Sequence, residues 1–229
     1  MMNNIKKYAI ILFVLGWVLT IGSCRKQYEA TEQDMSNYGW FLFEKAAIKS
    51  DYTESKNWFL ESINEDTTYM DGYNGLGWTY GKLTYLDSSI IFFTKGLKFQ
   101  ESIYDTTNIR QQVWAGLCFA YNAYGNDALS IQFGDSLIED LSSGLTSRPW
   151  MFNHNNINSK NKIDHLDVRV TLAASNFAVS EFSNSVLHIQ TILDGLSNSG
   201  TFEPDVNTVQ GRAELALWID SLQTILSSR

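Results

Sequence analysis

The fold is decided by the stretch from Asp71 to Leu97, which begins Asp-Gly-Tyr-Asn-Gly-Leu-Gly-Trp-Thr-Tyr and ends Ser-Ile-Ile-Phe-Phe-Thr-Lys-Gly-Leu. Both halves are rich in apolar and small residues, and a short polar break separates them. This pattern predicts two helices, the second of which returns along the first. Segments before and after the stretch repeat the pattern, so it is the unit from which the rest of the chain is interpreted.

The first half has the spacing of an aromatic residue, Leu-Gly and Tyr, held by Tyr73, Leu76, Gly77 and Tyr80. In this spacing the stretch resembles the tetratricopeptide (TPR) family of helix-pair repeats. The resemblance implies that Ser89 is the small residue and Phe93 the large residue of the returning helix, with Gly96 closing the contact. It names an architecture but no reaction and no partner.

A similar unit precedes this stretch at a distance of 34 residues, which is the TPR period. The matched positions are Leu42 with Leu76, Ser55 with Ser89, Trp58 with Phe92 and Phe59 with Phe93. In a third unit the TPR intervals are held by Trp114, Leu117 and Tyr121, and Cys118 stands where glycine is usual. With further helices at 164–182, 185–196 and 205–226, we expect an all-α, TPR-like helix-pair solenoid. It has three to four pairs and a C-terminal capping helix.

The N-terminus has the pattern of a secretory signal, in which Lys6 and Lys7 precede an apolar run over residues 8–21. The run of about 14 residues is shorter than the roughly 20 of a spanning helix, so a permanent transmembrane helix is the less favoured alternative. Residues 21–24, Ile-Gly-Ser-Cys, resemble the lipobox of bacterial lipoproteins. That resemblance implies a signal peptide over 1–23 and a lipid anchor with palmitate on Cys24. Because residue 25 is Arg and not Asp, it also implies the outer membrane.

We expect residues 24–35 to form a flexible tether and Ser36 to cap the first helix of a domain over 36–229. Residues 1–23 hold two of the 17 Lys and Arg residues and none of the 25 Asp and Glu residues, so without them the net charge is −10. Nucleic acid and anionic lipid head groups are therefore poor partners. Cys118 lies in an apolar segment, where a small buried side chain is favoured over a reactive thiol.

Residues 142–162 interrupt the helical pattern, and so long a loop is either functional or mobile. Its apolar core, Pro-Trp-Met-Phe at 149–152, is expected to pack onto the solenoid. Ser159 and Lys162 fit a Ser-x-x-Lys pattern but lack a helix that would aim the two side chains.

We expect neither an enzyme nor a metal or cofactor site, because metal-binding histidine pairs, nucleophile elbows, phosphate loops and Cys-x-x-Cys pairs do not occur. The histidines are His154, His165 and His188. Asp164, His165 and Asp167 could form part of a weak cation site. The favoured interpretation is that these acids complement the dipole of a helix that starts there.

A binding surface remains. In TPR proteins the positions one and five residues after the leading aromatic tend to face a concave groove. The resemblance therefore implies a partner-binding groove made of Trp40, Glu44, Asn74, Trp78, Lys82, Ala115 and Phe119. The alternative for Trp40, Trp78 and Phe119 is packing between helices.

The expected function is that of an envelope lipoprotein whose TPR-like domain binds other envelope proteins or peptides without catalysis. A second possibility is capture of a small ligand or glycan for nutrient uptake, as in lipoproteins of the starch-utilisation type. In that case Trp150 would be the platform for stacking against sugars.

Overall fold

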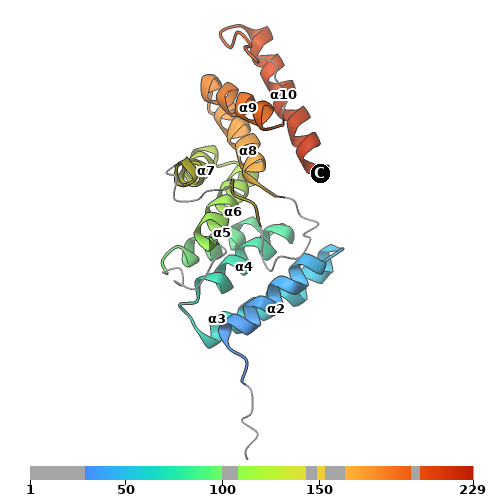
Figure 1. The fold of residues 1–229 in the computed structure, drawn as a ribbon, viewed down its shortest axis with the longest axis vertical. Helices are drawn as coiled ribbons and strands as arrows, with labels where there is room; N and C mark the ends of the chain where they lie inside the picture. Colours follow the sequence, from blue (N-terminus) through green and yellow to red (C-terminus); the bar gives the residue numbers. More distant parts are fainter. Residues whose placement is uncertain (1–28, 100–107, 143–148, 153–162, 197–201, 229) are drawn as a thin grey trace, which may run out of the picture. The chain divides into compact units, whose positions relative to one another are not determined.

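The computed structural model describes residues 29–99, 108–142, 149–152, 163–196 and 202–228 (Figure 1). The described helices are α2 (Glu32–Lys45), the short 3-10 helix η1 (Lys49–Asp51), α3 (Tyr52–Glu65), α4 (Met70–Lys82), α5 (Leu86–Gly96), α6 (Ile109–Tyr124), α7 (Asp127–Ser142), α8 (His165–Ala178), α9 (Phe182–Gly195) and α10 (Val209–Ser227). The described residues contain no strand, only an isolated bridge between Met151 and Asp164. None of these helices is long and apolar enough to cross a membrane.

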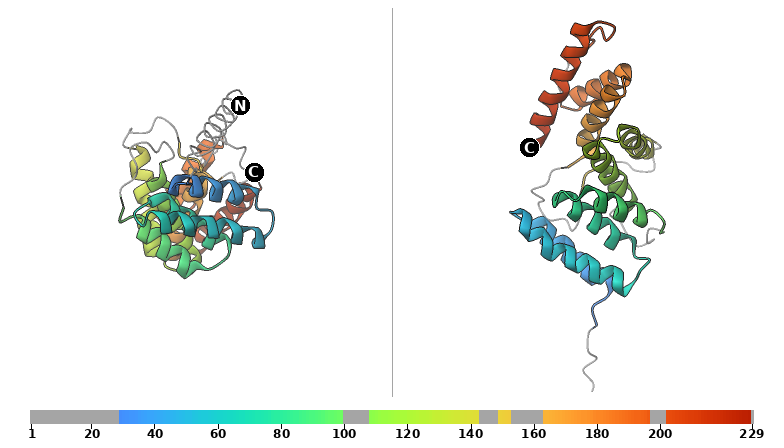
Figure 2. Two further views of the ribbon diagram at one scale, coloured as in Figure 1. Left: turned by 90° about the horizontal axis from the view of Figure 1, so that it is seen from below. Right: turned by 180° about the vertical axis from the view of Figure 1, so that it is seen from behind.

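The helices pack mainly on their neighbours in sequence. α2 packs on α3, α4 on α5, α6 on α7 and α8 on α9, and the second helix of each of the first three pairs also packs on the first helix of the next. α10 packs on α8 and α9, and the succession of pairs can be followed in Figure 2. The predicted all-α helix-pair solenoid with a C-terminal capping helix is therefore confirmed, with four pairs in the described residues. The finer TPR assignment stays a prediction.

The first helix starts earlier than predicted. Thr31 caps α2: the Asp34 amide donates to the Thr31 hydroxyl over 3.2 Å, and the Thr31 amide donates to the Asp34 carboxylate over 2.9 Å. This reciprocal arrangement is a capping box. The predicted cap at Ser36 is wrong, because Ser36 lies inside α2 with its buried hydroxyl turned to Asp71.

One hydrogen bond recurs in all four helix pairs. A buried serine in the second helix donates its hydroxyl to a backbone carbonyl in the first helix, over 2.7 to 2.9 Å. The pairs are Ser55 with Gly39, Ser89 with Gly77, Ser130 with Cys118, and Ser185 with Ala173. Each bond fixes the register of the two helices of its pair.

This bond corrects the alignment of the first pair. Serine and acceptor are 16 residues apart in that pair and 12 apart in the other three, because the connection that contains η1 is longer. Gly39 and Trp40 are therefore the counterparts of Gly77 and Trp78. The predicted pairing of Leu42 with Leu76 is displaced by about one helical turn. The repeated Gly-Trp dipeptide was the signal that could have found this register.

Phenylalanine rings separate successive first helices. Phe59 lies against Gly39 of α2 and Gly75 of α4, and a Cβ atom at Gly75 would lie 2.2 Å from the Phe59 ring. Phe93 lies in the same way against Gly77 and against Gly116 of α6. The glycines are needed here because any side chain would overlap a buried ring.

In the third pair the large and small residues exchange places. Cys118 occupies the position of Gly77, because each accepts the serine hydrogen bond of its pair. Gly134 of α7 occupies the position of Phe93, since it follows Ser130 by four residues as Phe93 follows Ser89. Leu172 of α8 fills the space: a Cβ atom at Gly134 would lie 2.6 Å from the Leu172 side chain and 3.0 Å from the Cys118 sulfur. The packing thus explains why a cysteine stands where glycine was expected.

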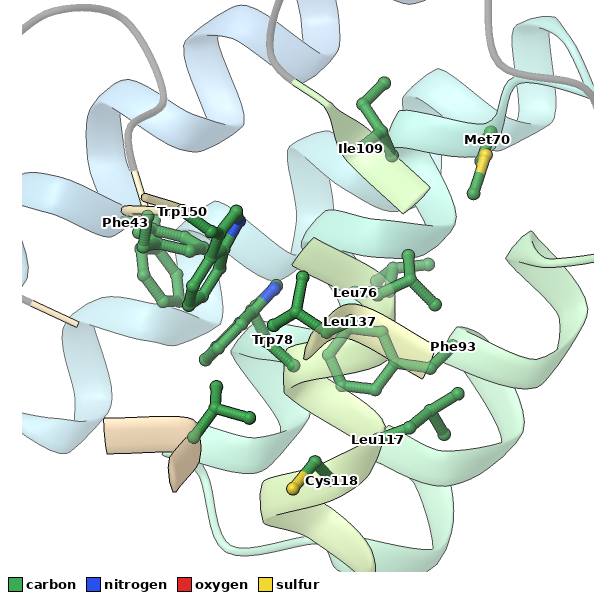
Figure 3. Close-up of a cluster of buried hydrophobic side chains, with 14 of the residues drawn as sticks. Phe43, Met70, Leu76, Trp78, Phe93, Ile109, Leu117, Cys118, Leu137 and Trp150 are labelled. Atoms are coloured by element: carbon green, nitrogen blue, oxygen red, sulfur yellow. The ribbon is translucent and has the colours of Figure 1, made fainter. Parts of the chain in front are cut away.

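The interior consists of two clusters of buried apolar residues. The larger one runs through the first three pairs and includes Trp150, Phe152 and part of α8 (Figure 3). The second lies among α8, α9 and α10, where Leu215 and Leu222 of α10 are buried. α10 thus covers apolar surface of the last pair. The predicted TPR packing residues Leu76, Gly77, Phe93 and Leu117 are buried, as is Tyr73, while Tyr80, Trp114 and Tyr121 are half-buried.

Gly116→Ala should lower the free energy of unfolding by about 1 to 3 kcal/mol, the usual effect of overpacking. The added Cβ atom would lie 2.2 Å from the Phe93 ring. Gly81→Ala is the matched control, because the nearest atom to its Cβ would be the Ser89 hydroxyl at 3.5 Å. Alanine should there stabilise the helix by up to about 1 kcal/mol. Urea denaturation measures the free energy of unfolding of both variants. An equal loss in the two would contradict the close packing of the Phe93 ring against Gly116.

Candidate functional site

The polar centre of the predicted groove is the buried carboxylate of Asp71 in the first turn of α4. One carboxylate oxygen accepts hydrogen bonds from the Ser36 hydroxyl over 2.6 Å and from the Trp40 indole N–H over 2.8 Å. The other accepts from the Asn74 amide over 3.2 Å. The same Asn74 amide nitrogen donates to Gln112 of α6 over 2.9 Å. The first helices of three pairs are thereby joined by side-chain hydrogen bonds.

The predicted groove residues Trp40, Asn74 and Trp78 are buried. Trp40 packs edge-on against the rings of Phe43 and Phe59, with centroids 5.4 Å and 5.0 Å away. Asn74 is engaged by its hydrogen bonds, and Ala115 is buried as well. In this structure these side chains line the interior, in line with the packing alternative.

A segment of the chain itself covers these aromatic residues. Phe152 is 1% exposed, and its ring lies 4.7 Å from Trp78, 5.6 Å from Trp40 and 6.2 Å from Phe43, centroid to centroid. The expectation that 149–152 packs onto the solenoid is confirmed. Trp150 is 4% exposed, so its faces are covered by the core (Figure 3). The predicted sugar platform at Trp150 is therefore wrong for this structure, because stacking needs an exposed ring face.

Two residues of opposite charge lie at corresponding positions of α2 and α4. Glu44 of α2 and Lys82 of α4 are counterparts in successive pairs; Glu44 is buried and Lys82 half-buried. Burial lowers the pKa of Lys82, and the negative charge of Glu44 acts in the opposite direction. Burial, followed by the charges of Glu44 and Asp51, raises the pKa of Tyr52. Glu44 thus contributes to the pKa of one group on α3 and of one on α4, while burial is the larger cause of both shifts.

Two apolar hollows lie along the first helices. The first has a volume of about 190 Å³ and is lined by residues that include Trp78, Lys82, Phe93, Phe119 and Ile163. The second, of about 270 Å³, is lined by residues that include Phe119, Ile163, Asp167, Val170 and Leu226. Phe119 and Ile163 border both hollows, so the two form neighbouring depressions over α4, α5, α6, α8 and the end of α10. Sequence reasoning missed the share of α8 and α10 in this surface.

No three His, Cys, Asp or Glu side chains among the described residues are placed to hold a metal ion. Asp164 caps α8 and forms a capping box with Asp167, which supports the helix-dipole interpretation of these acids. Burial raises the pKa of the Cys118 thiol to about 12. Burial and the charge of Arg169 lower the pKa of His188 to about 4, so this imidazole is neutral at pH 7.

Several predictions fall on residues that the structure does not describe. They concern the signal peptide over 1–23, lipidation at Cys24, the tether up to residue 28, His154 and the Ser159–Lys162 pattern. These stay predictions from the sequence.

A comparison of the chain with protein-family models found no match, and a comparison with curated proteins found none either. The function is therefore inferred from the sequence and from the site.

Asp71→Ala should lower the free energy of unfolding by about 2 to 4 kcal/mol, because the Ser36 hydroxyl and the Trp40 N–H lose a charged acceptor inside the protein. Asp87→Ala is the matched control: Asp87 also lies in the first turn of a helix, α5, but is exposed. Its loss should cost under about 1 kcal/mol. Thermal and urea unfolding give both values, and a similar small loss at Asp71 would show that the network does not stabilise the fold.

Proposed function

We propose that this protein is an envelope lipoprotein, anchored through Cys24, whose helix pairs hold other envelope proteins without catalysis. The lipobox resemblance at residues 21–24 supports the anchor, and the secretory pattern before it supports the envelope. The outer membrane is favoured because residue 25 is Arg. Multiple acyl chains would make the attachment durable, since each buried methylene contributes about 0.8 kcal/mol.

The observation that carries the proposal is the pair of hollows along the first helices. Their volumes, about 190 and 270 Å³, lie below the roughly 300 to 1,000 Å³ of small-molecule sites. Most of their exposed lining is apolar, although polar residues of α8 and α10 also border the second, and they lie side by side because they share Phe119 and Ile163. Two small, adjacent depressions suit the apolar side chains of a protein partner, which anchor an interface by filling pockets.

Charge further restricts the partner. Lys82 is the charged residue that lines the first hollow, and Asp167 is the one that lines the second. The first hollow therefore suits an apolar side chain next to an acidic group or a backbone carbonyl of the partner. The glycan alternative has no support, because the Trp150 ring that would stack against a sugar is buried.

The proposal is tested by recovering partners with the folded unit, residues 29–229, under mild crosslinking. Ala123→Trp should reduce the recovered partner at least about tenfold, because Ala123 lines the first hollow and the new ring would fill it. Ala128→Trp, at an exposed position of α7, is the matched control and should leave recovery unchanged. Quantitative mass spectrometry compares the three baits. Recovery of no envelope protein, or of the same set by Ala123→Trp, would overturn the proposal.

A further inference from the structure

We propose that residues Trp150 to Phe152 are an internal ligand of the aromatic groove, and that the partner is an extended segment with aromatic side chains at alternate positions that takes their place. The aromatic groove is defined by Trp40, Phe43 and Trp78. This inference rests on the proposed function and names the chemistry that the site recognises.

The segment is extended and pairs with residues 163–165 through two backbone hydrogen bonds. The Phe152 amide donates to the Ile163 carbonyl over 2.8 Å, and the His165 amide donates to the Trp150 carbonyl over 3.0 Å. Alternate side chains of a strand point to opposite sides. Accordingly Trp150 and Phe152 are buried while Met151 is 62% exposed. The backbone at 163–165 would offer the same donor and acceptor to any strand that ran along it.

Aromatic rings in the groove pack edge to face. The Phe152 ring meets Trp40 and Trp78 with interplanar angles of 65° and 61°. Edge-to-face arrangements of this kind are favourable because the positive edge of one ring meets the negative face of another. Two first helices, α2 and α4, contribute these rings, and the Asp71 hydrogen bond fixes the indole of Trp40.

The internal ligand fits imperfectly. Within the described part of the chain, the indole N–H groups of Trp78 and Trp150 have no hydrogen-bond acceptor, and the amide oxygen of Asn74 has no donor, although all three atoms are buried. Buried polar groups without partners are costly, so a segment that supplied an acceptor beside Trp78 would bind better than residues 150–152 do.

The aromatic groove continues into the first hollow. Trp78 contacts Phe152 on the groove side and also lines the hollow, together with Ile163, whose carbonyl holds the segment. A partner segment that ran beyond the internal one could place a further apolar side chain there. The groove and the hollow then act as one surface.

A peptide with the sequence of the internal ligand, Ser-Arg-Pro-Trp-Met-Phe-Asn-His, is the probe. A tethered segment has an effective concentration on the order of millimolar, so free peptide competes poorly in the wild-type protein. In the full chain in detergent micelles, Trp150→Ala/Phe152→Ala should bind the labelled peptide at least about tenfold more tightly than wild type does. Met151→Ala should behave like wild type. Fluorescence anisotropy measures the affinities.

A peptide in which Trp and Phe are replaced by Ala should not bind the Trp150→Ala/Phe152→Ala protein, which we call the opened variant because its groove lacks the two aromatic side chains. Equal, weak binding of both peptides to a folded opened variant would overturn the proposal. A wild-type dimer that the double substitution abolishes would also overturn it, since a second copy would then be the occupant. These outcomes do not depend on the natural partner, so they are distinct from a failure of the partner recovery.

If the Trp150→Ala/Phe152→Ala variant does not fold, crosslinking to the wild-type protein tests the proposal instead. Millimolar peptide with a photoreactive phenylalanine in place of Phe should crosslink to α2 and α4, at or next to Trp40 and Trp78. Crosslinks confined to other helices, or their absence, would overturn the proposal.

Discussion

The arrangement of the site depends on the buried carboxylate of Asp71. It accepts hydrogen bonds from Ser36 and Trp40 of one helix and from Asn74 of its own helix, and Asn74 continues the chain of bonds to Gln112. A buried carboxylate is stable only when such donors surround it. The network therefore holds the first helices of three pairs in a fixed relation. The aromatic rings that α2 and α4 present to residues 150–152 take their places from that relation.

The glycines give the same helices their spacing. Phe59 and Phe93 each fit between two first helices because Gly75 and Gly116 leave room for the rings. Where the third pair has Gly134 in place of the phenylalanine, a leucine from the next pair enters from the other side. The first hollow lies beside the Phe93 ring and is lined by Gly77 and Gly116, the two glycines that the ring contacts. Part of the binding surface we propose thus lies where a phenylalanine ring separates two first helices.

The helix pairs could be predicted from the sequence because the spacing of small and large residues, such as Ser89 and Phe93, is a local signal. The register of α2 could not be obtained from the 34-residue period, since the longer connection before Ser55 displaced the first helix by a turn. Burial of Asn74 was also missed. Its partners are Asp71 on its own helix and Gln112, 38 residues away, and no local pattern marks the latter contact. That 149–152 packs on the solenoid was predicted from its apolar composition, but its place against Trp40 and Trp78 needed the structure.

Amide hydrogen exchange of the wild-type protein tests whether residues 150–152 occupy the aromatic groove. The amides of Phe152 and His165 donate to the carbonyls of Ile163 and Trp150. Resolved by NMR, both should exchange about 100-fold or more slowly than in an unstructured peptide. Exchange of the Phe152 and His165 amides at the rate of an unstructured chain, with the amides of α4 protected, would show that the groove stands open and would contradict the account.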